Sequence, residues 1–147
     1  MMAIIFDTRP ERLDRDAIYR YLSQESYWAR GLPRAVFDRS LAGSLCFGGY
    51  DETGALVAFA RVITDRATFG YLADVFVLPG WRGQGISKAL MRYILDYPEL
   101  QNLRRFMLAT ADAHGLYAGY GFTPLSKPER LMERLDQDVY RRMTASE

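Results

Sequence analysis

A short glycine-rich segment, Pro79–Gly85, carries the clearest chemical signal in the chain. The residues that follow it show the hydrophobic spacing of a helix, so the segment opens a helix. The first N–H groups of a helix lack internal partners and lie at the positive end of its dipole. Gly83 and Gly85 allow the backbone to approach a ligand closely, and the nearby formal charges, on Arg82 and Lys88, are both positive. The segment therefore predicts a binding site for a phosphate or pyrophosphate group.

Three other interpretations of this segment compete with that prediction. A dinucleotide-binding loop of the type G-x-G-x-x-G would need a third glycine where the chain has Lys88, and the strands before it look like hairpins. A Walker loop is absent, because the sequence contains no G-x-x-x-x-G-K-[ST]. A plain turn between a strand and a helix stays open.

The elements that would position this segment alternate between short apolar runs and helical stretches. Turns at Asp51–Gly54 and Asp65–Ala67 join three runs into consecutive antiparallel strands. Helices that interrupt such a sheet predict an α+β or mixed α/β fold. The expected strands are 2–6, 44–50, 56–64, 68–78, 105–109, 122–125 and 131–135, the expected helices are 14–23, 34–41, 86–96 and 112–120, and the charged tail 136–147 is helical or frayed.

Length and composition indicate a single domain that spans residues 1–147, because 147 residues suit one core and no repeat or flexible linker divides them. A net charge of +1 disfavours nucleic acid and membrane surfaces as partners. Cys46 is the only cysteine and the chain has one histidine, which excludes an internal disulfide and a zinc centre of the usual kind, so we expect no metal. With no export signal or membrane span in sight, we expect a cytoplasmic protein.

Two motifs together resemble a known family. Arg82–Ser87 (RGQGIS) resembles the Q/R-x-x-G-x-G/A signature of the GNAT superfamily of acetyl-CoA-dependent N-acetyltransferases, and Leu72–Pro79 resembles its central strand. Leu116–Phe122 (LYAGYGF) resembles its later L-Y-x-x-x-G-F element, in the right order and roughly 30 residues further on. Ser87 stands where the family usually has Gly or Ala, and Thr110 where it often has Asn. The resemblance implies a mixed, mostly antiparallel central sheet, flanked by helices and splayed between the fourth and fifth strands.

The same resemblance implies acetyl-CoA as co-substrate. The pantetheine arm would pair like an added strand with the backbone of Phe76, Val77 and Leu78, since its buried amides need partners. An N–H near Val77 would stabilise the negative charge that develops on the thioester oxygen. Thr110 would contact the pantetheine arm or order the next helix. The pyrophosphate would be held by Arg82, Gly83, Gln84, Gly85, Ile86, Ser87 and Lys88.

Two residues are candidates for proton transfer. Tyr117 matches the tyrosine that the family uses as general acid towards the sulfur of coenzyme A, although it could simply be an aromatic residue packed on the sheet. Asp74 is the only carboxylate in the expected strand 68–78, where it must be paired or act in chemistry. Relatives such as spermidine/spermine acetyltransferases carry acidic residues around this position, which makes Asp74 a candidate general base. A structural pair with Arg61, or a water chain as base, stays open.

The acceptor site is expected at the loop between the first two helices. Tyr27 and Trp28 lie in this loop and would contact the acceptor or pack in the core. Arg61 could neutralise an acidic acceptor or pair with Asp74. Cys46 is expected to be a small buried hydrophobe rather than a nucleophile, so acetyl transfer would be direct.

The function predicted from the sequence is transfer of an acetyl group from acetyl-CoA to a primary amine of a small molecule, in a ternary complex. A sensor module that binds acyl-CoA without turnover is an alternative, and so is an acetyltransferase that acts on a protein or peptide amine. A homodimer is possible by analogy with the superfamily alone. The residues do not identify the acceptor.

Overall fold

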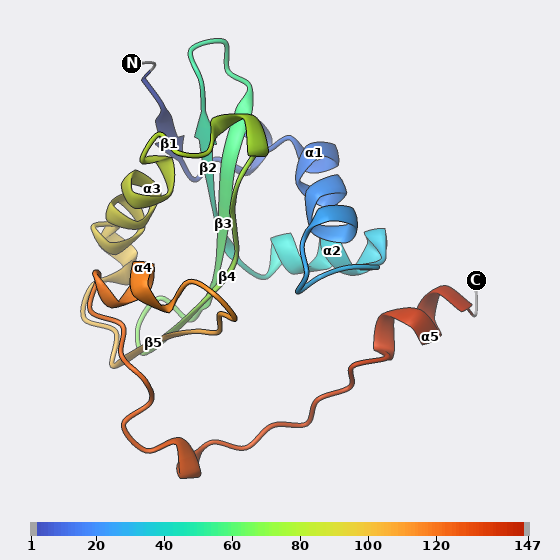
Figure 1. The fold of residues 1–147 in the computed structure, drawn as a ribbon, viewed down its shortest axis with the longest axis vertical. Coiled ribbons are helices and arrows are strands. Elements are labelled where there is room, and N and C mark those ends of the chain that lie inside the picture. Colours follow the sequence, from blue (N-terminus) through green and yellow to red (C-terminus); the bar gives the residue numbers. More distant parts are fainter. Residues whose placement is uncertain (1–2, 146–147) are drawn as a thin grey trace.

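The computed structural model of the chain describes residues 3–145 and contains one five-stranded sheet. Its strands lie side by side in the order of the chain, with every neighbouring pair antiparallel except β4 and β5, which are parallel (Figure 1). This arrangement confirms the mixed, mostly antiparallel fold expected from the sequence. The strands are β1 (Ile5–Asp7), β2 (Leu45–Tyr50), β3 (Leu56–Thr64), β4 (Phe69–Val77) and β5 (Arg105–Leu108).

Helices cover both faces of the sheet and create two apolar cores (Figure 1). On one face, α3 buries Leu90 and Ile94 against the sheet; on the other, α1 and α2 bury Ile18 and Phe37. The Asp14 carboxylate accepts a hydrogen bond from the N–H of Ala17 (3.1 Å) and caps the first helix as its sequence predicts. The helices are α1 (Arg15–Arg20), α2 (Arg34–Ala42), α3 (Ile86–Leu95), α4 (His114–Ala118) and α5 (Val139–Ala145), and a π-helical turn, Tyr21–Glu25, continues α1.

The chain after α4 differs from the expectation. The predicted strands 122–125 and 131–135 are absent, and the segment from residue 123 to α5 is mostly exposed chain with one 3₁₀ turn, Pro128–Arg130. Pro124 and Pro128 have no N–H to donate to a neighbouring strand, which weakens pairing in this segment. The tail does form the helix α5, whose Tyr140 packs on the core beside α1 and α2.

Residue 2 of the first expected strand and residues 146–147 of the tail lie outside the described range. Within residues 3–145, no helix has the length and apolar character that crossing a bilayer requires.

The sheet opens between β4 and β5. Their pairing begins at Phe69 with Arg105 and ends at Leu72 with Leu108, whereas β4 continues to Val77. Just past the last pair, the register between β3 and β4 shifts by one residue, so that Asp74 and Val75 together oppose a single residue of β3. Asp74 has a φ of 57°, in the left-handed region, which only Gly, Asn and Asp adopt with ease. This bulge bends β4 away from β5 and leaves one edge of the strand without a neighbour.

Candidate active site

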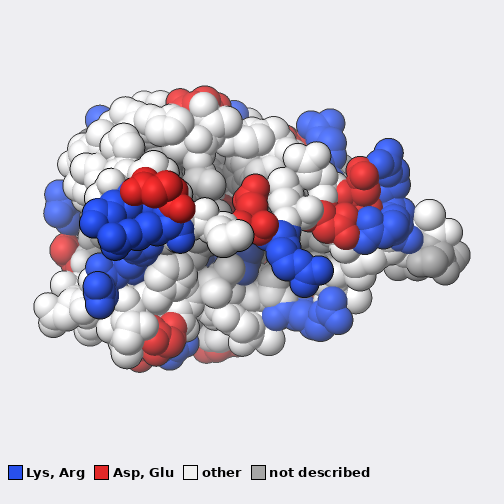
Figure 2. All heavy atoms as spheres, turned by 90° about the horizontal axis from the view of Figure 1, so that it is seen from below, with Lys and Arg blue, Asp and Glu red and all other residues white. Residues whose placement is uncertain are grey.

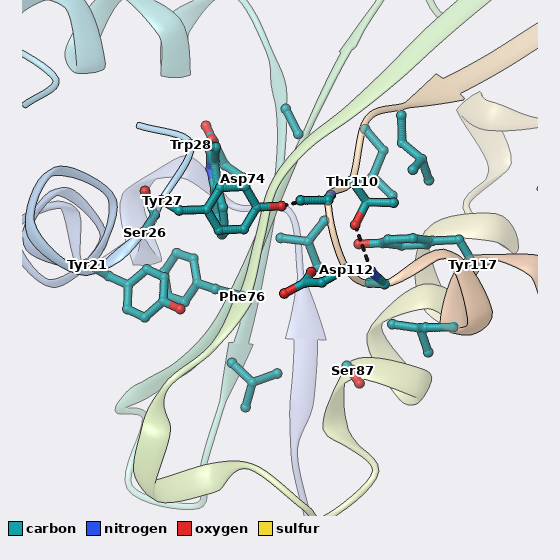
Figure 3. Close-up of a pocket in the computed structure, with 18 of the residues that line it drawn as sticks. Tyr21, Ser26, Tyr27, Trp28, Asp74, Phe76, Ser87, Thr110, Asp112 and Tyr117 are labelled. Carbon is teal, nitrogen blue, oxygen red and sulfur yellow. Dashed lines mark hydrogen bonds between the residues drawn. The ribbon is translucent and has the colours of Figure 1, made fainter. Parts of the chain in front are cut away.

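A cavity of about 770 Å³ fills the opening between β4 and β5 (Figure 3). One wall is the bulged half of β4, Tyr71–Val77, and the opposite wall is Leu108–Ala113, which leads from β5 to α4. Glu25–Trp28, after α1, borders one end, and the start of α3 borders the other. Tyr27 joins two of these walls, because its hydroxyl accepts a hydrogen bond from the N–H of Ala111 (3.1 Å).

The glycine-rich segment forms the end of the cavity at α3. Gly83 and Gly85 have φ values of 78° and 77°, which glycine adopts at little cost. Gly85 is the N-cap residue of α3 and provides no side-chain cap. Among residues 3–145, no acceptor is present for the N–H groups of residues 83–88. A row of free amides at the N-terminus of a ten-residue helix matches the oxygens of a pyrophosphate.

The predicted cofactor residues divide into two groups. Gly83, Gly85, Ile86 and Ser87 border the cavity together with Phe76, Val77, Arg82 and Thr110. Gln84 and Lys88 are exposed and do not border it, and neither does Leu78. The N–H of Leu78 donates to the carbonyl oxygen of Val57 in β3 (2.8 Å), so this residue faces β3 rather than the cavity.

Strand alternation assigns Val77 to the cavity side. Because Leu78 bonds to β3, the backbone groups of its neighbour Val77 point the other way, towards the missing strand. The carbonyl of Val77 accepts a hydrogen bond from the Arg82 guanidinium (3.1 Å), which also donates to the Tyr21 hydroxyl (2.9 Å). Arg82 therefore secures the end of β4, and the N–H of Val77 is the group that faces the cavity.

Tyr117 projects from α4 into the cavity (Figure 3) and is 9% exposed. Burial raises the pKa of its hydroxyl, with smaller contributions from Tyr27 and Asp112. The phenol is therefore fully protonated at neutral pH and able to donate. Thr110 accepts a hydrogen bond from the N–H of Ala113 (3.0 Å), which orders the turn into α4 and fulfils one of the two roles expected of it.

Asp74 borders the cavity, but both of its carboxylate oxygens already have partners. One accepts from the indole N–H of Trp28 (2.8 Å) and the other from Nε of Arg61 (2.8 Å). Arg61 also donates to the Ser44 hydroxyl (3.0 Å), and the Arg61 and Asp74 side chains are 15% and 10% exposed. The structural pair that the sequence left open is present. Arg61 lies behind Asp74 and does not border the cavity.

Trp28 and Tyr27 form the aromatic side of the cavity. Their rings meet edge to face, with centroids 5.0 Å apart, and they are 41% and 57% exposed. Asp74 fixes Trp28 through its indole N–H, and Ala111 fixes Tyr27 through its hydroxyl. Both rings therefore present an ordered apolar surface to whatever enters the cavity beside them.

Several cavity residues were not predicted as site residues, and Tyr21, Glu25 and Asp112 are the ones among them that bear on the chemistry. The Tyr21 ring stacks on Phe76 with centroids 4.1 Å apart. Asp112 stands five residues before Tyr117, after the expected strand 105–109, so a search for carboxylates next to the motif tyrosine would have found it. Glu25 precedes the aromatic pair by two residues and has no other sequence signal.

Cys46 and His114 lie away from the cavity. Cys46 is 6% exposed, its thiol points to the carbonyl of Leu41 (3.9 Å), and burial raises its pKa to about 11. Within residues 3–145, no three His, Cys, Asp or Glu side chains are grouped to hold a metal ion.

We expect the native protein to react far more slowly with a thiol-modifying reagent at pH 8 than the unfolded chain does, because burial leaves almost no thiolate on Cys46. C46S is expected to retain the turnover rate of the unmodified chain, since this residue does not border the cavity. Reaction rates followed by absorbance in native buffer and in urea test the first expectation. Fast labelling of the native chain together with loss of activity would contradict both.

Comparisons with known proteins agree with this geometry. The family model of the GNAT acetyltransferases matches residues 7–122. A Gibberella zeae protein named as an acetyltransferase is 35% identical over 135 residues, which cover 77% of this chain and 75% of the relative. The crystal structure of a protein from Xanthomonas campestris pv. campestris, described as a GNAT-family acetyltransferase, is 54% identical with a TM-score of 0.92 and covers 95% of this chain and 98% of its own. Glucosamine-6-phosphate N-acetyltransferase from Arabidopsis thaliana shares the fold at 14% identity, with a TM-score of 0.63 and coverage of 91% and 99%. The chain belongs to the GNAT family of acetyltransferases.

Proposed function

We propose that this acetyltransferase moves an acetyl group from acetyl-CoA to a primary amine of a small molecule by direct attack in a ternary complex. The family generally uses acetyl-CoA, which supplies an activated thioester. The cavity supports this choice because it combines free helix N-terminal amides at one end with an unpaired strand edge along one side. In this proposal the amides of residues 83–88 bind the pyrophosphate, and the open edge of β4 at Val77, with the Phe76 side chain beside it, binds the pantetheine amides.

The N–H of Val77 and the hydroxyl of Tyr117 are the chain's contributions to the chemical step. In the transfer, the carbon–sulfur bond breaks as the carbon–nitrogen bond forms. Val77 would donate its N–H to the carbonyl oxygen as negative charge develops there. Tyr117, kept protonated by burial, would give its proton to the departing sulfur. The attacking amine must lose a proton, either to Asp74 or to a water chain that reaches the solvent.

The paired geometry of Asp74 favours a positioning role alongside any role as base. Its two oxygens fix Trp28 and Arg61, so the carboxylate sets the aromatic side of the cavity. A proton from the amine would have to reach an oxygen that already accepts a hydrogen bond. We therefore propose that water takes part in removing the proton from the amine. Asp74, which lies in the bulge of β4, stays the other candidate base.

The observation that carries the proposal is the set of free amides at Gly83–Lys88, so cofactor binding is the test. We expect G85A to weaken coenzyme A binding by about five- to thirtyfold, because alanine at a φ of 77° costs about 1–2 kcal/mol and the free loop can avoid this cost by leaving the conformation that binds. A methyl group at Gly85 would meet no atom of residues 3–145 within 4 Å, so within this part of the chain the effect acts through the backbone.

Isothermal titration calorimetry with coenzyme A measures this effect. The matched control is G80A in the same segment, where φ is not positive and the added methyl also lies more than 4 Å from the other described residues. It is expected to bind coenzyme A as the unmodified chain does. If the unmodified chain takes up no coenzyme A, the proposal is wrong.

We also propose a homodimer. Met132 and Leu135, between Pro128–Arg130 and α5, are 97% and 65% exposed, and a second copy would cover such side chains. Light scattering after size exclusion measures the mass of the unmodified chain and of a variant with aspartate at both positions. A monomeric mass for the unmodified chain would exclude the dimer.

A further inference from the structure

Among the charged side chains that line the cavity, carboxylates outnumber cationic groups. Three carboxylates border it, those of Glu25, Asp74 and Asp112. Within residues 3–145, the only Lys or Arg side chain on its wall is Arg82, which donates to Val77 and Tyr21. One face of the molecule is hollowed near its centre, and acidic side chains lie next to the hollow (Figure 2). Apart from Arg82 and the free amides at the start of α3, which lie at the end proposed for the pyrophosphate, the residues that line the cavity have nothing to neutralise an anionic ligand.

Two of the three carboxylates are unpaired. Asp74 has two partners, whereas Glu25 and Asp112 make no hydrogen bond or ion pair with any residue from 3 to 145. The Asp112 side chain points into the cavity, between Phe76 and Tyr117 (Figure 3). The unpaired carboxylate of Asp112 therefore faces the interior of the cavity.

The opposite side of the cavity is aromatic. Tyr27 and Trp28 offer ring faces and edges, and a cation near such rings gains electrostatic stabilisation that a neutral group does not. Unpaired carboxylates together with exposed aromatic rings select for a positively charged ligand. The same surroundings disfavour a carboxylate or phosphate on the acceptor, because the exposed carboxylates of Glu25 and Asp112 repel a like charge in the cavity.

We infer that the acceptor is an aliphatic amine with a second cationic group and no anionic group, and that Asp112 is the residue that determines this specificity. This inference rests on the proposed N-acetyltransferase function and names its substrate class. One nitrogen of the acceptor is acetylated next to Tyr117. The other remains an ammonium and is bound by Asp112. Glu25, in the segment that also carries Tyr27 and Trp28, adds negative electrostatic potential to the cavity.

Three acceptors of equal chain length test the inference: 1,4-diaminobutane, butylamine and 4-aminobutanoate, which end in an ammonium, a methyl and a carboxylate. With purified full-length protein and acetyl-CoA, release of the free thiol gives kcat/KM for each. We expect the order diamine, butylamine, amino acid, with the diamine at least tenfold above butylamine, as a charge-assisted hydrogen bond implies.

Substitutions test whether Asp112 causes the preference for the diamine. D112N is expected to raise KM for the diamine about tenfold and to leave butylamine and acetyl-CoA little changed, which removes the discrimination. E25Q should have the same effect to a smaller degree. The matched control is E52Q, a carboxylate in the turn before β3 that does not border the cavity, and it should leave all three acceptors unchanged.

Several results would overturn the inference. One is equal or better use of 4-aminobutanoate; another is a D112N variant that loses affinity for acetyl-CoA while it still prefers the diamine. If coenzyme A binds but no acceptor is turned over, calorimetry with the diamine and the loaded protein decides, and no heat of binding rejects the inference. Failure of the proposed function is distinguishable from these results, because calorimetry would then detect no binding of coenzyme A.

Discussion

Replacing Tyr117 by phenylalanine is expected to lower kcat by about 10²- to 10⁴-fold, the usual contribution of a positioned general acid. The hydroxyl of Tyr117 makes no hydrogen bond with residues 3–145, so Y117F should leave the melting temperature close to that of the unmodified chain. Coenzyme A affinity should also be kept, because the amides of residues 83–88 are untouched. Stopped-flow thiol detection and calorimetry on the same preparations separate the two effects.

The pH dependence adds a second readout for this tyrosine. A general acid must be protonated, and burial raises the pKa of Tyr117 above its ordinary value of 10. The rate should therefore stay insensitive to Tyr117 ionisation near neutral pH and fall only as the pH rises through the raised pKa. Y117F should lack that alkaline limb. A variant with an unchanged rate and an unchanged limb would remove Tyr117 from the mechanism.

Replacing Asp74 by alanine is expected to lower the free energy of unfolding by about 3 kcal/mol or more, the usual cost of breaking a largely buried ion pair. The substitution leaves the Arg61 guanidinium without its carboxylate and the Trp28 indole without its acceptor. It also forces alanine to adopt a φ of 57°, which costs about 1–2 kcal/mol more for residues with an ordinary side chain. Urea unfolding followed by tryptophan fluorescence measures the change.

Two variants at the same position separate these contributions. D74G removes the carboxylate but tolerates the left-handed backbone, so it should be more stable than D74A by about 1 kcal/mol. D74N keeps a carbonyl oxygen for Trp28 and tolerates the same backbone, so it should be the least destabilised of the three. Equal stability of D74A and D74G would show that the bulge does not impose the backbone conformation.

Local sequence signals predicted the parts of the fold that depend on neighbouring residues. The glycine-rich segment before α3, the cap at Asp14 and the turns that join β2, β3 and β4 each follow from turn chemistry or helical spacing over a few positions. Tyr117 could be assigned because its motif has a fixed distance from the glycine-rich segment. The predicted strand 131–135 was wrong, because a strand also depends on pairing with residues far away in the sequence. Its residues, Leu131–Leu135, include no β-branched or aromatic side chain, and no neighbouring strand within the described residues pairs with them.

Contacts that depend on sheet register could not be predicted. The hydrogen bond between Trp28 and Asp74 joins residues 46 positions apart and requires the bulge in β4. Whether Leu78 or Val77 faces the cavity depends on which one bonds to β3, and one residue of shift reverses the answer. Asp112 lies on a connecting loop without any periodic pattern, so only its place in three dimensions shows what it faces.

The hydrogen bond between the Tyr27 hydroxyl and the N–H of Ala111 has a kinetic consequence. It ties the loop proposed to contact the amine to the loop proposed to lie beside the thioester. A ligand that displaces either loop must first break this single exposed contact, and the other loop then loses its support. Occupancy of one half of the cavity thus changes the shape offered to the second reactant. Steady-state patterns for this enzyme should accordingly show that the apparent affinity for each reactant varies with the concentration of the other.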